Sequence, residues 1–144
     1  AYKIGLASEE RYKRYINKDF VRFHGFTDET RLQQLLIESD ILTMTRVDSI
    51  QARYGFPYKL SEALALGKPV LCTDVGDVGR YVKHLHDVFL VKPDDSMAIY
   101  SGLKQLLENK ELCCKLGVNA RMTAQRYFDV KTNGDNLLEF LENV

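Results

Sequence analysis

The stretch over residues 55–74, G-F-P-Y-K-L-S-E-A-L-A-L-G-K-P-V-L-C-T-D, constrains the fold most strongly. A glycine and a proline open it, and proline suits a first helical turn because the N–H that it lacks would have no partner there. Residues 58–66 are good helix formers with one apolar face, and Gly67 is expected to end the helix in a left-handed conformation. Residues 69–73 form a short apolar run that is typical of a buried parallel strand. The stretch therefore predicts a loop, a helix and a strand in succession.

The start of this helix is a candidate anion site. Free N–H groups and the helix dipole favour a phosphate at such a position, and Lys59 adds a full positive charge there. Glu62 follows one turn later and can accept hydrogen bonds from a diol such as that of ribose. A cation for phosphate and a carboxylate for a diol together suit a nucleoside diphosphate. An ordinary surface ion pair would show the same residue types, because exposed helix positions are usually charged.

Strands and helices alternate in the rest of the chain. Five short apolar runs are expected to be strands, over 2–7, 20–23, 41–44, 69–73 and 88–91. Residues 46–54 are expected to be a polar loop. Further helices are expected over 8–17, over 80–84 and over 110–128, the last with a possible break at Gly117. A helix after residue 28 is expected to be capped by Thr27 or Asp28, and a helix over 97–109 by Asp95 or Ser96. A last helix is expected after Asp129. This alternation predicts an α/β fold, a Rossmann-like parallel sheet sandwiched by helices, with a helical C-terminal segment.

In such a sheet, ligands bind beyond the carboxyl ends of the strands, where the strand order reverses. That rule selects the loops at 7–8, 25–27, 45–46 and 53–62, with 73–77 behind them. Arg46 follows a strand end in this group and is a candidate phosphate contact, although a solvated loop arginine is the plainer interpretation.

Several phrases of the sequence resemble one enzyme family. G-x-P-x-K-x-x-E-A-x-A-x-G-K-P-V runs into T-D-V-G-D-V, and further phrases match at 21–26, 39–43, 90–95 and 106–112. In this order they are similar to the donor-binding, C-terminal domain of a GT-B glycosyltransferase of the group 1, or family 4, type. The resemblance covers nearly the whole chain.

The resemblance implies a role for each candidate residue. It places the nucleotide base at Phe26 and Thr27, the ribose hydroxyls at Glu62, and the diphosphate at Lys59 and the backbone around Pro57. The same loop includes Gly55. Arg46 is a further candidate.

Tyr54 stands where many relatives carry a second glutamate that contacts the sugar. This departure puts the sugar contact in doubt. It matches the G-x-P-x-K subgroup, and we interpret it as variation within that subgroup.

The implied reaction transfers a hexose from a nucleotide-diphospho-sugar to an acceptor hydroxyl, with retention, in polysaccharide or glycoconjugate synthesis. Relatives carry one more strand before this chain's first residues, and an N-terminal acceptor domain. Residues 1–144 are therefore expected to be a fragment that does not transfer sugar alone, since transfer needs donor and acceptor aligned between two domains. Two alternatives stay open: a different enzyme on the same GT-B architecture, such as a sugar-nucleotide epimerase or a phosphorylase, and a non-catalytic module that binds a nucleotide or a partner.

Composition excludes several other classes. The 144 residues suffice for one compact domain, and 20 basic residues balance 20 acidic ones, so no net charge favours nucleic acid. No apolar run is long enough to span a bilayer. Three cysteines form no disulfide framework and no zinc pattern, which favours the cytoplasm, and the resembling enzymes need no metal or other cofactor. The expected partners are a nucleotide sugar and, through the missing domain, a sugar or lipid-linked acceptor.

Overall fold

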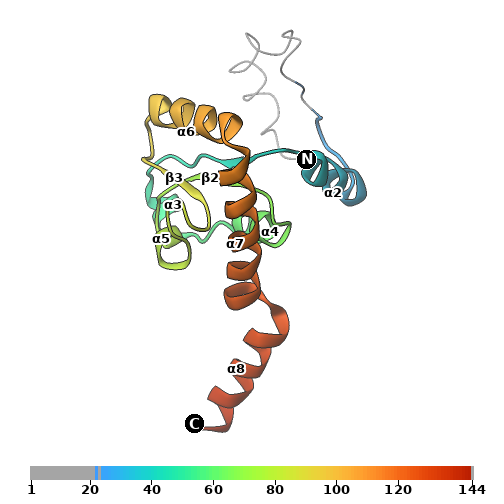
Figure 1. Ribbon diagram of the computed structural model, residues 1–144. Coiled ribbons are helices and arrows are strands. Elements are labelled where there is room, and N and C mark those ends of the chain that lie inside the picture. Colours follow the sequence, from blue (N-terminus) through green and yellow to red (C-terminus); the bar gives the residue numbers. More distant parts are fainter. Residues whose placement is uncertain (1–21, 23, 144) are drawn as a thin grey trace. The chain divides into compact units, whose positions relative to one another are not determined.

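The computed structural model describes residue 22 and residues 24–143 (Figure 1). The chain divides into two units, residues 1–34 and 35–144. Helix α2 (Glu29–Glu38) begins in the first unit, where the Asp28 carboxylate accepts the Arg31 N–H at 2.7 Å. Of the two expected caps, the structure therefore confirms Asp28. The strand and helix expected over 2–7 and 8–17 lie outside the described residues, as does the strand over 20–23 apart from Arg22, which is not in a strand.

The second unit contains a three-stranded parallel sheet in the order β1-β2-β3. The strands are Leu42–Met44, Val70–Thr73 and Phe89–Val91, which confirms three of the expected strands. Leu42 pairs with Val70 across β1 and β2, and Leu71 pairs with Phe89 across β2 and β3. All four residues of the central strand β2 are buried, as expected of an apolar strand covered on both faces.

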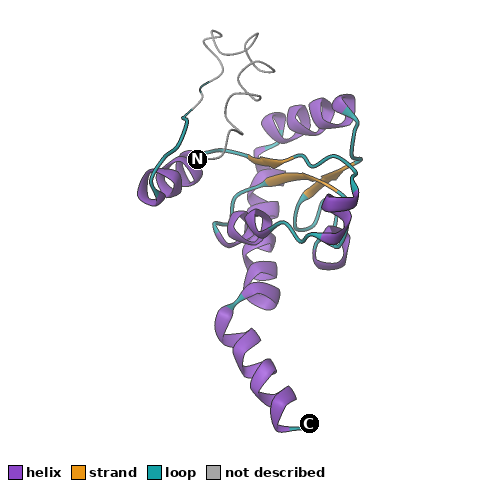
Figure 2. Cartoon of the chain, turned by 180° about the vertical axis from the view of Figure 1, so that it is seen from behind, coloured by secondary structure: helices purple, strands orange, loops and turns teal. Residues whose placement is uncertain are grey.

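Helices connect and cover the strands (Figure 2). Their bounds are Ile50–Tyr54 for α3, Tyr58–Ala65 for α4, Val78–Tyr81 for α5, Ser96–Glu108 for α6, Lys110–Phe128 for α7 and Val130–Glu142 for α8. The side chains of Asp95 and Asp129 accept hydrogen bonds from the first turns of α6 and α8. Gly67 has φ +66°, so the left-handed end of α4 is confirmed.

Three local expectations were wrong. Residues 46–54 are not all loop, because the Ser49 hydroxyl accepts the Ala52 N–H at 3.2 Å and starts helix α3. The short helix expected over 80–84 begins at Val78 and ends at Tyr81. Gly117 does not break α7, which is continuous. A Cβ at Gly117 would overlap the Gly67 carbonyl, so this glycine instead lets α7 approach the end of α4.

Two apolar clusters pack on opposite faces of β2. On one face Val70 and Cys72 contact α4 and α7, and on the other face Leu71 contacts the α6 side chain Leu106. Each fully buried leucine contributes about 1.5–3 kcal/mol through the burial of apolar surface. This packing fixes the ends of the strands and the position of α4, on which the candidate site depends.

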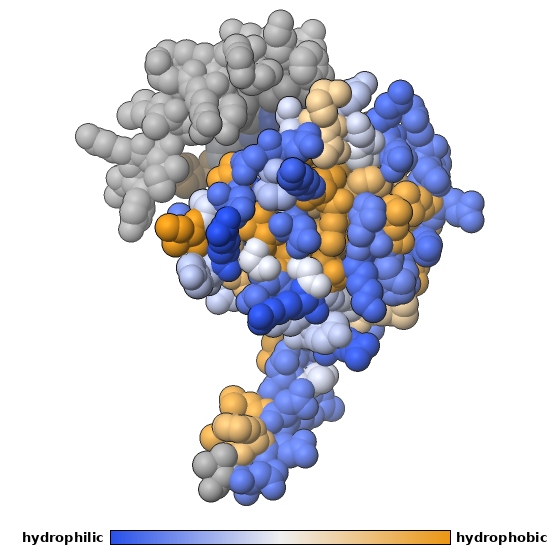
Figure 3. Space-filling view, turned by 90° about the vertical axis from the view of Figure 1, so that its left-hand side faces the viewer, coloured by the Kyte–Doolittle hydropathy of each residue, from blue (hydrophilic) through white to orange (hydrophobic). Residues whose placement is uncertain are grey.

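Helix α8 continues beyond this core and has no buried residues. Its apolar side chains gather near its C-terminal end, where Figure 3 shows them exposed, and they include Leu137, Leu138, Phe140 and Leu141. Among the helices of the described part, none is both long enough and apolar enough to cross a membrane.

Candidate functional site

The three parallel strands end at one edge of the sheet, which we call the carboxyl edge. The chain leaves β1 there and forms a loop over residues 45–57 that contains α3 and leads to α4. The turn after β2 and the turn after β3, residues 92–95, lie at the same edge. Because the strands are parallel, these segments come together although they are far apart in the sequence.

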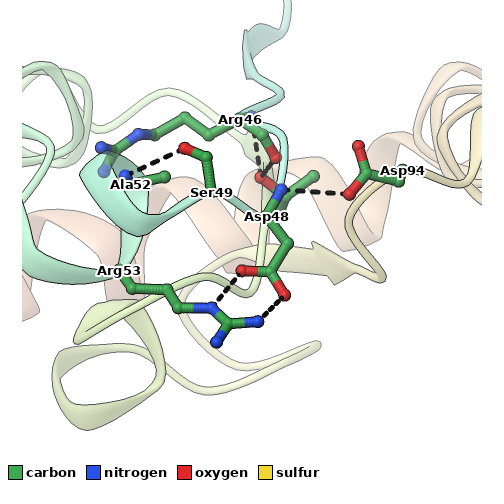
Figure 4. Close-up of polar contacts among 7 residues, drawn as sticks. Arg46, Asp48, Ser49, Ala52, Arg53 and Asp94 are labelled. Carbon is green, nitrogen blue, oxygen red and sulfur yellow. Dashed lines mark hydrogen bonds and ion pairs between the residues drawn. The ribbon is translucent and has the colours of Figure 1, made fainter.

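Arg46 ties the loop to the sheet at two points. Its backbone N–H donates to the Thr73 hydroxyl at 2.8 Å, and that hydroxyl donates to the Arg46 carbonyl oxygen at 2.9 Å. Its guanidinium donates to the Gly55 carbonyl oxygen at 2.7 Å. Half-buried Arg46 therefore holds both the start of the loop and Gly55, the residue before the turn into α4. Figure 4 shows Arg46 in this loop.

An ion pair closes the middle of the loop (Figure 4). The Arg53 guanidinium donates two hydrogen bonds to the Asp48 carboxylate, at 2.6 and 2.7 Å. These hydrogen bonds lower the pKa of Asp48 and raise that of Arg53, so both groups stay charged near neutral pH. The Asp48 N–H in turn donates to an Asp94 carboxylate oxygen at 3.1 Å, which links the loop to the turn after β3.

Gly76, in the turn after β2, packs against the backbone of α3. It has φ +66°, and a Cβ at this position would lie 2.7 Å from the Arg53 carbonyl oxygen and 3.0 Å from that of Ala52. The chain therefore makes a tight turn at this glycine. Only a glycine combines this backbone conformation with such a close approach.

The start of α4 carries free donors and a cation. Pro57 is the N-cap, its carbonyl oxygen accepts the Leu60 N–H at 2.8 Å, and no side chain caps the helix. Lys59 is exposed in the first turn, and exposed Glu62 follows it. Among the described residues, neither Lys59 nor Glu62 forms an ion pair. The first turn therefore presents N–H groups and a positive charge to solvent, as an anion site requires.

Glu62 opens onto a groove of about 430 Å³ between α4, α7 and the start of α8. Arg121 and Gln125 of α7 line the same groove. A second cavity, of about 280 Å³, lies at the carboxyl edge and is lined by residues that include Arg46, Thr73 and Asp94. The segment over residues 45–62 therefore contributes side chains to both hollows.

Five predicted site residues lie in one segment of the chain, although Arg46 and Glu62 line different hollows. Arg46, Gly55, Pro57, Lys59 and Glu62 belong to one continuous segment of the second unit.

Tyr54 ends α3 with its side chain 89% exposed. Phe26 and Thr27 are exposed and belong to the first unit, not to the unit that contains the other predicted site residues.

Sequence reasoning missed Arg53 and Asp94. Arg53 and Asp48 lie in a segment that was interpreted as loop. Ser49, which caps helix α3 through the Ala52 N–H, was the signal for this helix, and the helix brings Arg53 close enough to pair with Asp48. Asp94 contacts a residue 46 positions away, and no local pattern indicates that contact. In the described part, no three or more His, Cys, Asp or Glu side chains are grouped to hold a metal ion.

Comparison with known proteins agrees with this fold, an α/β domain of the type that forms the C-terminal half of a GT-B glycosyltransferase. Residues 7–123 match the model of the family described as glycosyl transferases group 1, and the chain belongs to that family. The glycosyltransferase group 1 family predicted from the sequence is thereby confirmed.

Among curated relatives, the putative glycosyltransferase EpsD of Bacillus subtilis is 29% identical over 112 residues, which cover 78% of this chain and 28% of EpsD. A trehalose phosphorylase of Pleurotus pulmonarius is 29% identical over 118 residues, covering 82% of this chain and 15% of the relative. Among solved structures, Anabaena Alr3699/HepE in complex with UDP-glucose has a TM-score of 0.80 at 24% identity, covering 97% of this chain and 37% of HepE. The chain thus spans well under half the length of each of these proteins.

Proposed function

We propose that the chain binds a nucleotide-diphospho-sugar at the carboxyl edge, as the donor domain of a glycosyltransferase. The observation that carries the proposal is the start of α4, which no side chain caps and beside which Lys59 is exposed. Arg46 fixes the approach to this helix through its hydrogen bond to Gly55. The complex of HepE with UDP-glucose supports the ligand class, because HepE shares this fold.

Each residue of the proposed site has a defined role. The N–H groups after Pro57 and the Lys59 ammonium bind the diphosphate, and Glu62 accepts hydrogen bonds from the ribose hydroxyls. For the base, the resemblance points to Phe26 and Thr27, which belong to the first unit of the chain. Tyr54 is proposed to lie beside the sugar.

The proposed reaction moves the sugar to an acceptor hydroxyl in polysaccharide or glycoconjugate synthesis. As the bond to the sugar breaks, negative charge grows on the leaving diphosphate, and the fixed cation and helix dipole at the start of α4 stabilise it. This stabilisation needs no metal ion in the proposal. The resemblance to family 4 adds retention at the anomeric carbon and a cytoplasmic location to it. The acceptor binds to another part of the protein, so this chain alone is not expected to transfer sugar.

The similarity to trehalose phosphorylase supports a second candidate, a phosphorylase on the same fold. In that case the start of α4 would bind inorganic phosphate rather than a diphosphate. Competition distinguishes the two candidates: inorganic phosphate at millimolar concentration displaces a nucleotide only weakly from a donor site, whereas a phosphorylase site binds phosphate and no nucleotide.

The test is calorimetric titration of the chain with UDP, GDP and ADP. We expect one nucleotide to bind, and Glu62→Ala to raise its Kd about 10- to 100-fold through the loss of charge-assisted hydrogen bonds. Glu108→Ala is the matched control, because Glu108 is exposed on α6 and pairs only distantly, at 3.9 Å, with Lys104. Equal Kd values for wild type and Glu62→Ala would refute the role of Glu62, and no binding of any nucleotide would refute the proposed function.

A further inference from the structure

We propose that Asp94 is a positioning residue for the donor loop, defined as residues 45–57. The inference rests on the function proposed above. An Asp94 carboxylate oxygen accepts the Asp48 N–H at 3.1 Å, across 46 residues of sequence. Asp48 lies where the loop leaves the sheet, so this hydrogen bond fixes the direction in which the loop starts (Figure 4).

The backbone at Asp94 is in the left-handed region, with φ 58°. Aspartate is among the few residues besides glycine that visit this region, and non-glycine residues pay a cost there. The next residue, Asp95, has a different role, because its carboxylate accepts the Ala98 N–H at 2.9 Å and caps α6. Two adjacent carboxylates thus serve two elements, Asp94 the donor loop and Asp95 the helix.

Ala52 and Phe56 anchor the second half of the donor loop in and against the core, whereas polar contacts hold its first half, residues 45–50. Its apolar residues Val47 and Ile50 are 61% and 78% exposed, so they add little to its stability. Beside the loop lies the cavity of about 280 Å³ that Asp94 also lines. With exposed apolar side chains and open space next to it, this first half of the loop depends on its hydrogen bonds for one defined conformation.

Contacts within the loop connect the hydrogen bond between Asp48 and Asp94 to helix α3. Asp48 holds the Arg53 guanidinium, and the Arg53 N–H donates to the Ser49 carbonyl oxygen at 2.9 Å. Helix α3 therefore moves as one piece with Asp48, and it ends directly before Gly55 and the start of α4. Loss of the bond at Asp94 leaves the loop with more conformations to lose when a ligand binds, which lowers affinity.

The experiment compares three variants of the chain by calorimetric titration with UDP, GDP and ADP, by melting temperature and by amide hydrogen exchange. Asp94→Gly keeps the left-handed backbone and removes the acceptor. Asp94→Asn keeps both the backbone conformation and an acceptor oxygen. Asn109→Ala is the matched control, because it removes the side-chain cap of another helix, α7, and leaves the carboxyl edge intact.

For Asp94→Gly we expect a Kd about 3- to 10-fold higher, from the loss of one net hydrogen bond, with a melting temperature within about 2 °C of wild type. Amides of residues 47–54 should exchange faster in this variant. Asp94→Asn should stay within about 3-fold of wild type in Kd. Asn109→Ala should melt about 2–6 °C lower, through the lost cap, with unchanged Kd.

An Asp94→Gly variant with the Kd and loop exchange of wild type would overturn the inference. So would an Asp94→Asn variant as weak as Asp94→Gly, because the acceptor oxygen is what separates the two. Failure of the wild-type chain to bind UDP, GDP or ADP would instead overturn the proposed function, and with it the role of Asp94. The two failures are therefore distinguishable in one set of titrations.

Discussion

Substitution of Gly76 by alanine tests the packing of α3 on the turn after β2. Gly76 and Gly67 both have φ +66°, so alanine at either position pays the cost of a left-handed backbone. They differ in their surroundings. A Cβ at Gly76 would lie 2.7 Å from the Arg53 carbonyl oxygen, whereas at Gly67 the nearest atom, the Gly117 carbonyl oxygen, is 3.4 Å away.

The expected magnitudes follow from these distances. The left-handed conformation costs alanine about 1–2 kcal/mol, which is the whole effect expected for Gly67→Ala. For Gly76→Ala, overlap with backbone adds about 1–3 kcal/mol, because a peptide group cannot rotate away as a flexible side chain can. In a chain of this size, each kcal/mol lowers the melting temperature by about 3–4 °C.

Urea denaturation monitored by circular dichroism measures the free energy of unfolding of both variants. We expect Gly76→Ala to be less stable than Gly67→Ala by about 1–3 kcal/mol, and to bind nucleotide more weakly because α3 is displaced. Equal stabilities would show that α3 does not pack on Gly76, and would refute the arrangement of the donor loop described above.

Two further predictions concern buried groups. Burial raises the pKa of the Cys72 thiol to about 12, whereas Cys114 is exposed. Iodoacetamide at pH 8 should therefore label Cys114 in the native chain and Cys72 only after unfolding, and mass spectrometry would show which cysteine is labelled. Labelling of Cys72 in the native chain would contradict its burial. Burial would also raise the pKa of Asp87, but hydrogen bonds to its carboxylate, including those from His86 and Thr123, lower it. The stabilisation by Asp87 is therefore complete above about pH 4 and is lost as the pH falls through the lowered pKa. In urea denaturation, Asp87→Asn should cost about 1–3 kcal/mol at pH 7 and progressively less below pH 4, and a difference from wild type that does not depend on pH would contradict this account.

The sequence allowed prediction of the elements whose signals are local. Pro57, the apolar face of α4, the left-handed Gly67 and the run over β2 follow one another within a few residues, and the structure confirms them. The family followed from the same stretch. Gly117 was misinterpreted because it serves to let two helices approach, and that approach involves a residue 50 positions earlier in the chain.

The contacts that shape the candidate site could not be predicted. Arg46 was a candidate for phosphate, but its bond to the Gly55 carbonyl oxygen depends on where the loop returns. The hydrogen bond from Asp48 to Asp94 joins the ends of two strands and exists only once the sheet has formed. Sequence patterns identify which residues have suitable chemistry, whereas the sheet determines which of them meet.

The central claim is that a nucleoside diphosphate binds at the start of α4. Its most direct test is to record amide ¹H–¹⁵N spectra of the labelled chain during titration with UDP, GDP and ADP. We predict that one nucleotide shifts the amides of residues 58–62 most strongly, because the N–H groups of Tyr58 and Lys59 at the helix start bind the diphosphate and Glu62 binds the ribose. Largest shifts elsewhere, for example around Asn119 on α7, or no shifts with any of the three nucleotides, would contradict the claim.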